Sequence, residues 1–328
     1  MRSRRLVAVC VVAFSCSLVA AVAPSAQVDR SFPKPRCEYV KAGPPGPRGN
    51  RLVVWRRNGV YSVQREGKRI VVGGRDFGCR MATIYNVDRI LLRADRETVV
   101  VSERGGAFAP GATHERAGSE IEIRADVPQL EWLGSEGPDE VRVSTLSQGR
   151  VGLQLDAVAD GRVPDYDMIL PHPPKALRLL AGHGADLLSS RRLTNMGDPG
   201  LYRVIRLFGE QGNDTLLGGP RDEWRLGDGA GDDLIVTGGG SDEIALGLGH
   251  DTVYGGDGED NLYYAVYRGR SNRTRPDVAD RLFGGFGNDL LSDENRHRDL
   301  LDCGPGHDIA LGEKHDRPRR DCESDGRV

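Results

Sequence analysis

One nine-residue pattern repeats four times without a gap in the stretch DGAGDDLIV-TGGGSDEIA-LGLGHDTVY-GGDGEDNLY, residues 228–263. Positions two and four of every block are glycine, at Gly229, Gly231, Gly238, Gly240, Gly247, Gly249, Gly256 and Gly258. Position six is always aspartate, at Asp233, Asp242, Asp251 and Asp260. Position eight is always aliphatic, at Ile235, Ile244, Val253 and Leu262. Such self-similarity at a fixed short period is the signature of a repeat architecture.

Weaker copies extend the pattern on both sides. Residues 209–217 carry Asp214, residues 284–292 carry Gly285, Gly287 and Asp289, and residues 303–311 carry Asp308. Two weak copies lie far upstream, at Asp139 and Asp186, and two degenerate copies without the glycines occur at Asp280 and Asp299. The 218–226 block is interrupted by Pro220 and Arg221, and residues 264–274 are typical of an inserted loop. The repeat therefore reaches back to about residue 134.

The four columns predict a turn followed by a short strand. Glycine permits the positive φ angles of a sharp turn, and one inward aliphatic residue between two outward neighbours fits a three-residue strand. Two blocks then make one coil of 18 residues, which places Asp233 over Asp251 and Asp242 over Asp260. We predict an all-β, right-handed parallel β-roll or β-helix over about residues 130–322, preceded by a small β segment.

Stacked coils bring acidic side chains together. Strands of adjacent coils lie about 4.8 Å apart, so the carboxylates repel one another unless a cation neutralises them. Residues 209–263 hold 13 Asp or Glu against only two Lys or Arg, Arg221 and Arg225. Carboxylates and turn carbonyls together offer the six to eight oxygen ligands that Ca²⁺ prefers. The alternative is a series of solvated Gly/Asp turns without bound metal.

The blocks resemble the G-G-x-G-x-D-x-U-x repeat of the hemolysin-type (RTX) calcium-binding family. The resemblance implies several bound Ca²⁺ ions, with carboxylate ligands from Asp214, Asp233, Asp242, Asp251, Asp260, Asp289 and Asp308. It also implies carbonyl ligands from the turn glycines, at Gly229, Gly231, Gly238, Gly240, Gly247, Gly249, Gly256, Gly258, Gly285 and Gly287. Residues 302–308 and 321–323 are similar to the C-terminal cap of actinobacterial members, and residues 106–113 and 119–123 to their N-terminal parts, for which no activity is known.

The N-terminus predicts export. Arg2, Arg4 and Arg5 precede an apolar stretch over 6–23, and small residues follow, so residues 1–26 are typical of a signal peptide. A membrane anchor is the alternative, because 18 apolar residues are at the lower limit for spanning. Four cysteines remain after cleavage, which suggests two disulfides; of three pairings, Cys37–Cys79 with Cys303–Cys322 is the most economical. The expected location is extracellular or at the cell surface, without a stable membrane span.

The remaining sequence contains no catalytic signature. Neither H-E-x-x-H nor G-x-S-x-G occurs, so we expect a protein that is not an enzyme. With 45 basic against 48 acidic residues, no strong field favours nucleic acid, and no protein or polysaccharide partner is indicated. The alternatives are a β-helix enzyme such as a polysaccharide lyase, epimerase or hydrolase, and a calcium-dependent adhesion or scaffold module. The expected divisions are 1–26 (signal peptide), 27–130 (β-rich segment), 131–208 (degenerate coils), 209–311 (calcium-binding roll) and 312–328 (cap and tail).

Overall fold

A computed structural model of the chain divides into two units, Met1–Phe32 and Pro33–Val328, and every residue described below belongs to the second. The structure describes residues 36–41, 50–56, 60–73, 79, 82–106, 108, 121–155, 166–193, 205–264, 278–293, 297–312, 316–318 and 321–325. The segment expected to be a signal peptide lies outside these residues. In the part that the structure describes, no helix has the length and apolar character needed to cross a membrane.

The described strands form two long sheets. In spatial order, the first sheet contains β1 (Arg36–Val40), β2 (Arg51–Arg56), β5 (Arg89–Ala94), β7 (Glu122–Asp126), β11 (Met168–Leu170), β10 (Val151–Leu155), β9 (Glu140–Thr145), β13 (Leu187–Arg192), β15 (Thr215–Leu217), β17 (Leu234–Gly239), β19 (Thr252–Asp257), β21 (Arg281–Phe286), β23 (Leu300–Asp302) and β25 (Arg317–Pro318). The order follows the chain except where β11 and β10 lie between β7 and β9.

The second sheet also extends from the N-terminal to the C-terminal strands of the chain. From its C-terminal edge it contains β26 (Ser324–Asp325), β24 (Ile309–Gly312), β22 (Leu290–Asp293), β20 (Asn261–Tyr264), β18 (Glu243–Leu246), β16 (Trp224–Ala230), β14 (Ile205–Gln211), β12 (Ala176–His183), β8 (Gln129–Leu133), β6 (Thr98–Ser102), β3 (Tyr61–Glu66) and β4 (Arg69–Val72). One short 3-10 turn, η1 (Ser147–Gly149), is the only helical element in the described ranges.

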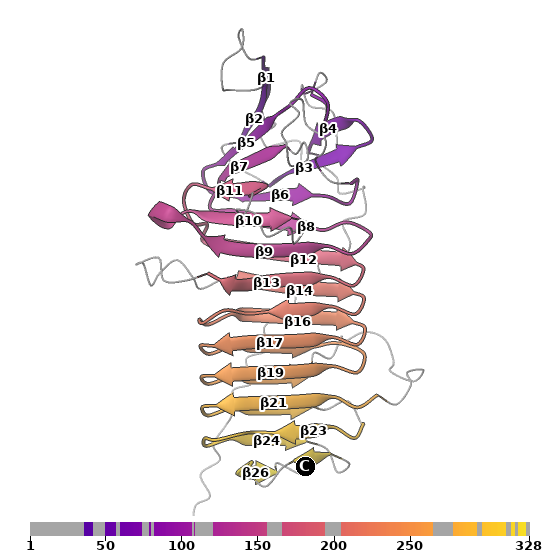
Figure 1. The fold of residues 1–328 in the computed structure, drawn as a ribbon, viewed down its shortest axis with the longest axis vertical. Coiled ribbons are helices and arrows are strands. Elements are labelled where there is room, and N and C mark those ends of the chain that lie inside the picture. Colours follow the sequence, from indigo (N-terminus) through magenta and orange to yellow (C-terminus); the bar gives the residue numbers. More distant parts are fainter. Residues whose placement is uncertain are drawn as a thin grey trace, which may run out of the picture. The chain divides into compact units, whose positions relative to one another are not determined.

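From β12 onward the chain alternates between the two sheets, and each strand pairs in parallel with the strand of the next coil (Figure 1). Ile235 of β17 lies opposite Val253 of β19, and Ile244 of β18 lies opposite Leu262 of β20. These partners are 18 residues apart, so one coil contains two nine-residue blocks. The predicted parallel roll and its register are confirmed.

The core of the roll is a double row of inward side chains, which occupy position eight of each block except for Leu226, the ninth residue of the irregular 218–226 block. In the first sheet these are Leu216, Ile235, Val253, Leu282 and Leu301, and in the second sheet Leu226, Ile244, Leu262, Leu291 and Ala310. All ten are at most 1 % exposed. Burial of an aliphatic side chain of this size stabilises the fold by about 1.5–3 kcal/mol, so the repeated inward residue is what joins the two sheets.

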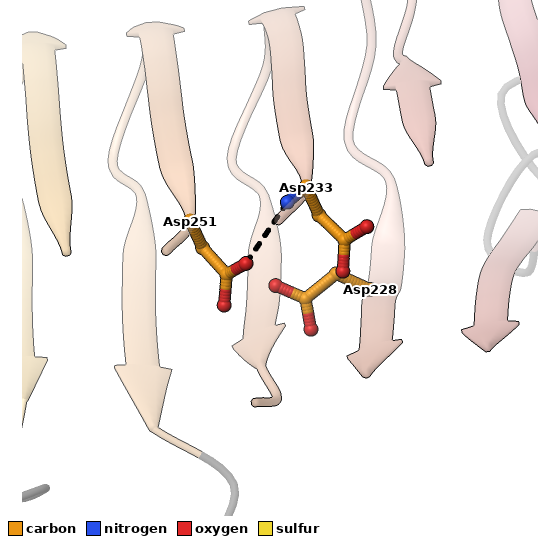
Figure 2. Close-up of side chains that lie close together, drawn as sticks. All are labelled: Asp228, Asp233 and Asp251. Atoms are coloured by element: carbon orange, nitrogen blue, oxygen red, sulfur yellow. Dashed lines mark hydrogen bonds between the residues drawn. The ribbon is translucent and has the colours of Figure 1, made fainter. Parts of the chain in front are cut away.

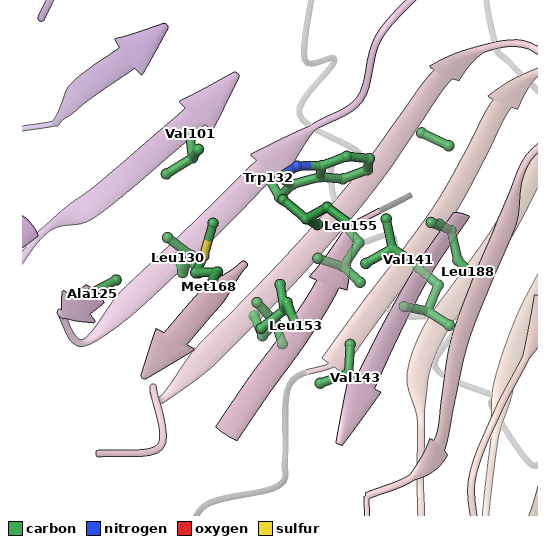
Figure 3. Packing of buried hydrophobic residues seen from close by; sticks show 14 of the residues in the cluster. Val101, Ala125, Leu130, Trp132, Val141, Val143, Leu153, Leu155, Met168 and Leu188 are labelled. Carbon is green, nitrogen blue, oxygen red and sulfur yellow. The ribbon is translucent and has the colours of Figure 1, made fainter. Parts of the chain in front are cut away.

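The N-terminal half continues the same two sheets with a broader core. The segment expected to be β-rich, residues 27–130, contains β2, β3, β4 and β6 among its strands, and β2 pairs in parallel with β5. Antiparallel pairs also occur here: β1 with β2, β3 with β4, and β10 with both neighbours, β9 and β11. Larger side chains fill the interior, including Trp132, Leu153 and Met168, each fully buried (Figure 3).

Two disulfides join residues of the terminal regions. Cys37 bonds Cys79, with Cα atoms 5.7 Å apart, and Cys303 bonds Cys322, with Cα atoms 5.3 Å apart. Both separations lie within the usual range for a disulfide. The pairing expected from the sequence is confirmed.

Candidate metal sites between the coils

The position-six aspartates form two vertical rows, one along each edge of the roll. On the turns that lead from the second sheet to the first, the backbone amide of each aspartate donates a hydrogen bond to Oδ1 of the next one. The first ladder contains Asp139, Asp186, Asp214, Asp233, Asp251, Asp280, Asp299 and Asp316, with N–O distances of 2.6–3.2 Å. The row is continuous from the first of these residues to the last.

A second ladder occupies the opposite edge, on the turns that lead from the first sheet to the second. It contains Glu223, Asp242, Asp260, Asp289 and Asp308, with N–O distances of 2.6–2.9 Å. Each amide therefore uses one oxygen of the carboxylate in the next coil. The second oxygen of each accepting aspartate in this ladder takes no part in these hydrogen bonds.

That second oxygen accepts no hydrogen bond along most of both ladders. The atoms concerned are Oδ2 of Asp186, Asp214, Asp233, Asp242, Asp251, Asp260, Asp289, Asp299 and Asp308, and Oε2 of Glu223. These ten residues are between 0 and 3 % exposed. A buried carboxylate oxygen without a partner costs free energy, and such atoms in a native fold are usually satisfied by ordered water, a ligand or an ion.

Where the first residue of a block is glycine, the missing side chain leaves a small space beside an unpartnered oxygen. At Gly255, a β-carbon would lie 2.5 Å from Oδ2 of Asp260 and 2.5 Å from the carbonyl oxygen of Gly284. At Gly284, it would lie 2.5 Å from Oδ2 of Asp289 and 2.6 Å from the carbonyl oxygen of Cys303. Each space is thus bordered by a carboxylate oxygen and a carbonyl oxygen from the next coil. Such hard oxygen donors fit Ca²⁺.

The carboxylates are strained electrostatically in the absence of a cation. Burial, and with it repulsion between neighbouring carboxylates, raises the pKa of Asp233 to about 8 and that of Asp260 to about 7. Burial also raises the pKa of Glu223 to about 9 and that of Asp289 to about 6. A positive ion between the coils would lower these pKa values again, because it favours the charged form of each group.

Three carboxylates converge most closely on the first ladder. Oxygens of Asp228, Asp233 and Asp251 all lie within 4.8 Å of one another, and all three residues are buried. Figure 2 shows Asp228 beside the hydrogen bond from the Asp233 amide to Oδ1 of Asp251. This is the densest group of potential metal ligands in the described part of the chain.

Comparison with known families identifies these turns. The family model for the RTX calcium-binding nonapeptide repeat matches the chain in four copies, over residues 206–220, 228–263 and 279–293. These segments are RTX calcium-binding repeats. The matched model describes a calcium-binding repeat and not a catalytic domain. No curated protein and no solved structure matches the chain.

All seven aspartates predicted from the RTX pattern lie in the ladders. Asp214, Asp233 and Asp251 belong to the first ladder, and the second contains Asp242, Asp260, Asp289 and Asp308. Asp308 lies beyond the matched RTX segments and still continues its ladder. Their role as metal ligands stays a prediction.

The glycines predicted to supply carbonyls have a clear packing role. A β-carbon on Gly258, at φ +137°, would collide with the carbonyl oxygen of Gly240 in the preceding coil, and one on Gly256 would collide with that of Gly238. Positions two and four therefore need glycine because the turns stack backbone against backbone. Calcium ligation by the carbonyls of these glycines stays a prediction.

Several buried acidic residues in the ladders, and Asp228 beside the first ladder, are not among the predicted ligands. Asp186, Asp280 and Asp299 stand out in the sequence only as degenerate copies, and the repeat pattern does not single out Asp228 or Glu223 at all. The useful signal for the first three is an aliphatic residue two positions later, at Leu188, Leu282 and Leu301, each of which is fully buried. Glu223 takes the place of aspartate in the irregular 218–226 block, where its amide donates to Oδ1 of Asp242.

At Asp139, unlike most ladder residues, both carboxylate oxygens accept hydrogen bonds within the same turn. Its Oδ2 accepts a hydrogen bond of 2.7 Å from the Ser135 amide, and its Oδ1 accepts one of 3.1 Å from the Ser135 hydroxyl. Neighbouring Asp186 has an unpartnered Oδ2 instead. In the first ladder, the carboxylate oxygens without a hydrogen bond therefore begin at Asp186.

Proposed function

We propose that this chain is a secreted calcium-binding repeat protein in which Ca²⁺, held between stacked Gly/Asp turns, drives folding and stability outside the cell. The observation that carries the proposal is the row of buried carboxylate oxygens without hydrogen bonds along each edge of the roll. The RTX match supports it independently, because it covers the central turns of both rows.

The proposed ligands are the seven predicted aspartates together with carbonyls of the turns. Each Ca²⁺ takes six to eight oxygens at about 2.3–2.6 Å, and the irregular coordination suits a cage shared by two coils. Mg²⁺ needs a smaller, nearly octahedral cage and gives up its water reluctantly, so it should bind much more weakly. Because each ladder spans several coils, we propose several ions per chain.

Calcium binding would be coupled to folding because the cages exist only when the coils are stacked. Without the ion, the chain must bury unpaired negative charge, as the raised pKa values of Asp233 and Asp260 indicate. A site with a Kd of about 0.1 mM contributes about 1.4 kcal/mol at about 1 mM free calcium. A few such sites together match the stability of an ordinary domain, about 5–15 kcal/mol.

Two further features support a location outside the cell. Cys37–Cys79 and Cys303–Cys322 are bonded, and disulfides persist in oxidising compartments. Residues 1–26 are typical of a signal peptide. N-terminal sequencing of protein from the culture medium of the native host should give a start near Ser25 to Val28. An uncleaved Met1 on protein retained in the cell would contradict the proposal of export.

Circular dichroism of the mature chain tests the proposed function. Calcium-free protein should show reduced β-sheet signal and a low melting temperature, and millimolar calcium should raise both. Magnesium at the same concentration is the control for ionic strength and should have little effect. The double variant Asp251→Asn/Asp260→Asn should lose most of the calcium response, while the exposed Asp257→Asn should keep it. Equal responses to calcium and magnesium would contradict the proposal.

A further inference from the structure

One turn of the roll departs from its neighbours at the first position of the block. That position is glycine at Gly209, Gly218, Gly255 and Gly284, and it is Leu246, Thr237 and Cys303 in three other blocks. Asp228 is the only carboxylate among these described position-one residues. A β-carbon at Gly255 or Gly284 would lie 2.5 Å from the unpartnered oxygen of the same turn, so a side chain at this position begins beside the space between the coils.

Asp228 places its carboxylate in that space. The side chain is fully buried, its Oδ1 accepts a hydrogen bond of 2.6 Å from the Gly229 amide, and its Oδ2 accepts none. Oxygens of Asp233 and Asp251 lie within 4.8 Å, and the Oδ2 atoms of these two residues also accept no hydrogen bond. Figure 2 shows the three carboxylates gathered between two coils. Three buried carboxylates this close repel one another when ionised, and a cation bound between them would offset that repulsion.

The equivalent position on the opposite edge shows that Asp228 is not required for the turn itself. There, Thr237 is buried, and its hydroxyl donates to the carbonyl oxygen of Gly255 instead of contributing charge. Glycine fills the position in the blocks of Asp214, Asp260 and Asp289. The fold therefore accepts no side chain, a neutral one or a charged one at this point. A third buried negative charge destabilises the roll unless a cation is bound.

We infer that Asp228 is a side-chain calcium ligand that, with Asp233 and Asp251, forms a three-carboxylate site with the highest affinity in the roll. The inference rests on the proposed calcium-binding function and names one site within it. Affinity of oxygen cages for Ca²⁺ rises with the number of charged ligands. This turn should therefore fill first as calcium rises, and it would begin the stacking of the central coils.

Calorimetric calcium titrations of the full mature chain test this, with Asp228→Gly, Asp228→Asn and the control Asp257→Asn. Asp228→Gly installs the residue found at Gly209, Gly255 and Gly284, so it should fold. The wild type and Asp257→Asn should show a tightest class of about one ion, and both Asp228 variants should weaken that class at least about tenfold while retaining the weaker sites.

Melting temperatures of the same proteins separate a ligand from a structural residue. Without calcium, Asp228→Asn should melt higher than the wild type, because one of three repelling buried charges is gone; with calcium it should melt lower. A merely structural aspartate would lower the melting temperature in both conditions. Unchanged calcium affinities in Asp228→Gly, beside a wild type that binds calcium, would overturn this inference alone. A wild type that binds no calcium would overturn the proposed function as well.

Discussion

The backbone amide of Asp242 donates a hydrogen bond to Oδ1 of Asp260, 2.9 Å away in the next coil. Both residues are 2 % exposed, and Oδ2 of each accepts no hydrogen bond. The two oxygens of the Asp260 carboxylate thus differ: Oδ1 fixes the register of the neighbouring coil, and Oδ2 faces the space between the turns. Because the same arrangement recurs along both ladders, coil stacking and the proposed calcium binding would depend on the same side chains.

The pH dependence of the calcium-free roll should be opposite to that of most proteins. Burial raises the pKa of Asp233 to about 8 and that of Asp260 to about 7, whereas the unfolded value is 3.8. The folded state therefore binds more protons between about pH 4 and pH 8, and its stability falls as pH rises through this window. Melting temperatures in calcium-stripped buffer should decrease from about pH 5 to about pH 8. Millimolar calcium should flatten the trend, and a calcium-free melting temperature that rises with pH would contradict the assignment of these carboxylates.

Central and terminal aspartates should differ in their effect on calcium-dependent stability. Asp251→Ala removes the acceptor of the Asp233 amide, and Asp308→Ala removes that of the Asp289 amide, so each costs about 1–3 kcal/mol from one unpaired buried N–H group. Asp251 also has ladder neighbours on both sides, whereas Asp308 lies near the C-terminal end. Asp251→Ala should lose about 1 kcal/mol more of the stabilisation by calcium, measured by urea unfolding with and without the ion. A larger loss in Asp308→Ala would contradict shared cages in the central coils.

Glycine at position four should be essential for stacking. Gly258 has φ +137°, and a β-carbon there would collide with the carbonyl oxygen of Gly240, so Gly258→Ala should cost about 3 kcal/mol or more. Gly137 is a matched control, because its φ is not positive and a β-carbon at this position would lie 4.0 Å from its nearest neighbour, the Ser135 hydroxyl oxygen. Gly137→Ala should change the free energy of unfolding by less than about 1 kcal/mol. Similar effects of the two substitutions would show that the coils are not packed this tightly.

The C-terminal disulfide should close the last coils of the roll. Cys303 is fully buried and bonds Cys322 across a separation of 19 residues, and the Glu323 amide donates to the carbonyl oxygen of Asp308. Peptide mapping without reduction should recover the Cys303–Cys322 pair from secreted protein. The paired Cys303→Ser/Cys322→Ser variant should lose about 3 kcal/mol of stability in denaturant unfolding. Detection of a free thiol at either position would contradict this cap.

The sequence is sufficient to predict the roll wherever the period is strict. Position eight identifies the inward residues such as Ile235 and Val253, and position six identifies the ladder partners Asp233 and Asp251, because an 18-residue coil leaves no other register. The antiparallel pairing of β9, β10 and β11 does not follow from the pattern. Alternating buried residues, as in Val141 and Val143, are equally compatible with either strand direction, and only tertiary pairing decides between them.

The candidate sites are predicted incompletely for a different physical reason. Asp280 lies 29 residues after Asp251, and its Oδ1 still accepts the hydrogen bond from the Asp251 amide. The extra residues between the two aspartates therefore do not interrupt the ladder. Because the Asp280 block lacks glycine at positions two and four, the sequence pattern alone gives this aspartate little weight. Asp228 does not stand out because position one varies among glycine, threonine, leucine, cysteine and aspartate, and the proximity of Asp228 to Asp233 depends on the close packing of the turns.

Anomalous diffraction from crystals of the mature protein grown in millimolar calcium tests the central claim most directly. Calcium should give peaks between successive turns, about 2.3–2.6 Å from Oδ2 of Asp233 and Asp251 on one edge and of Asp242 and Asp260 on the other. Peaks at these oxygens that disappear when calcium is replaced by magnesium would agree with the account. Ladders whose Oδ2 atoms contact only water molecules at this calcium concentration would contradict it.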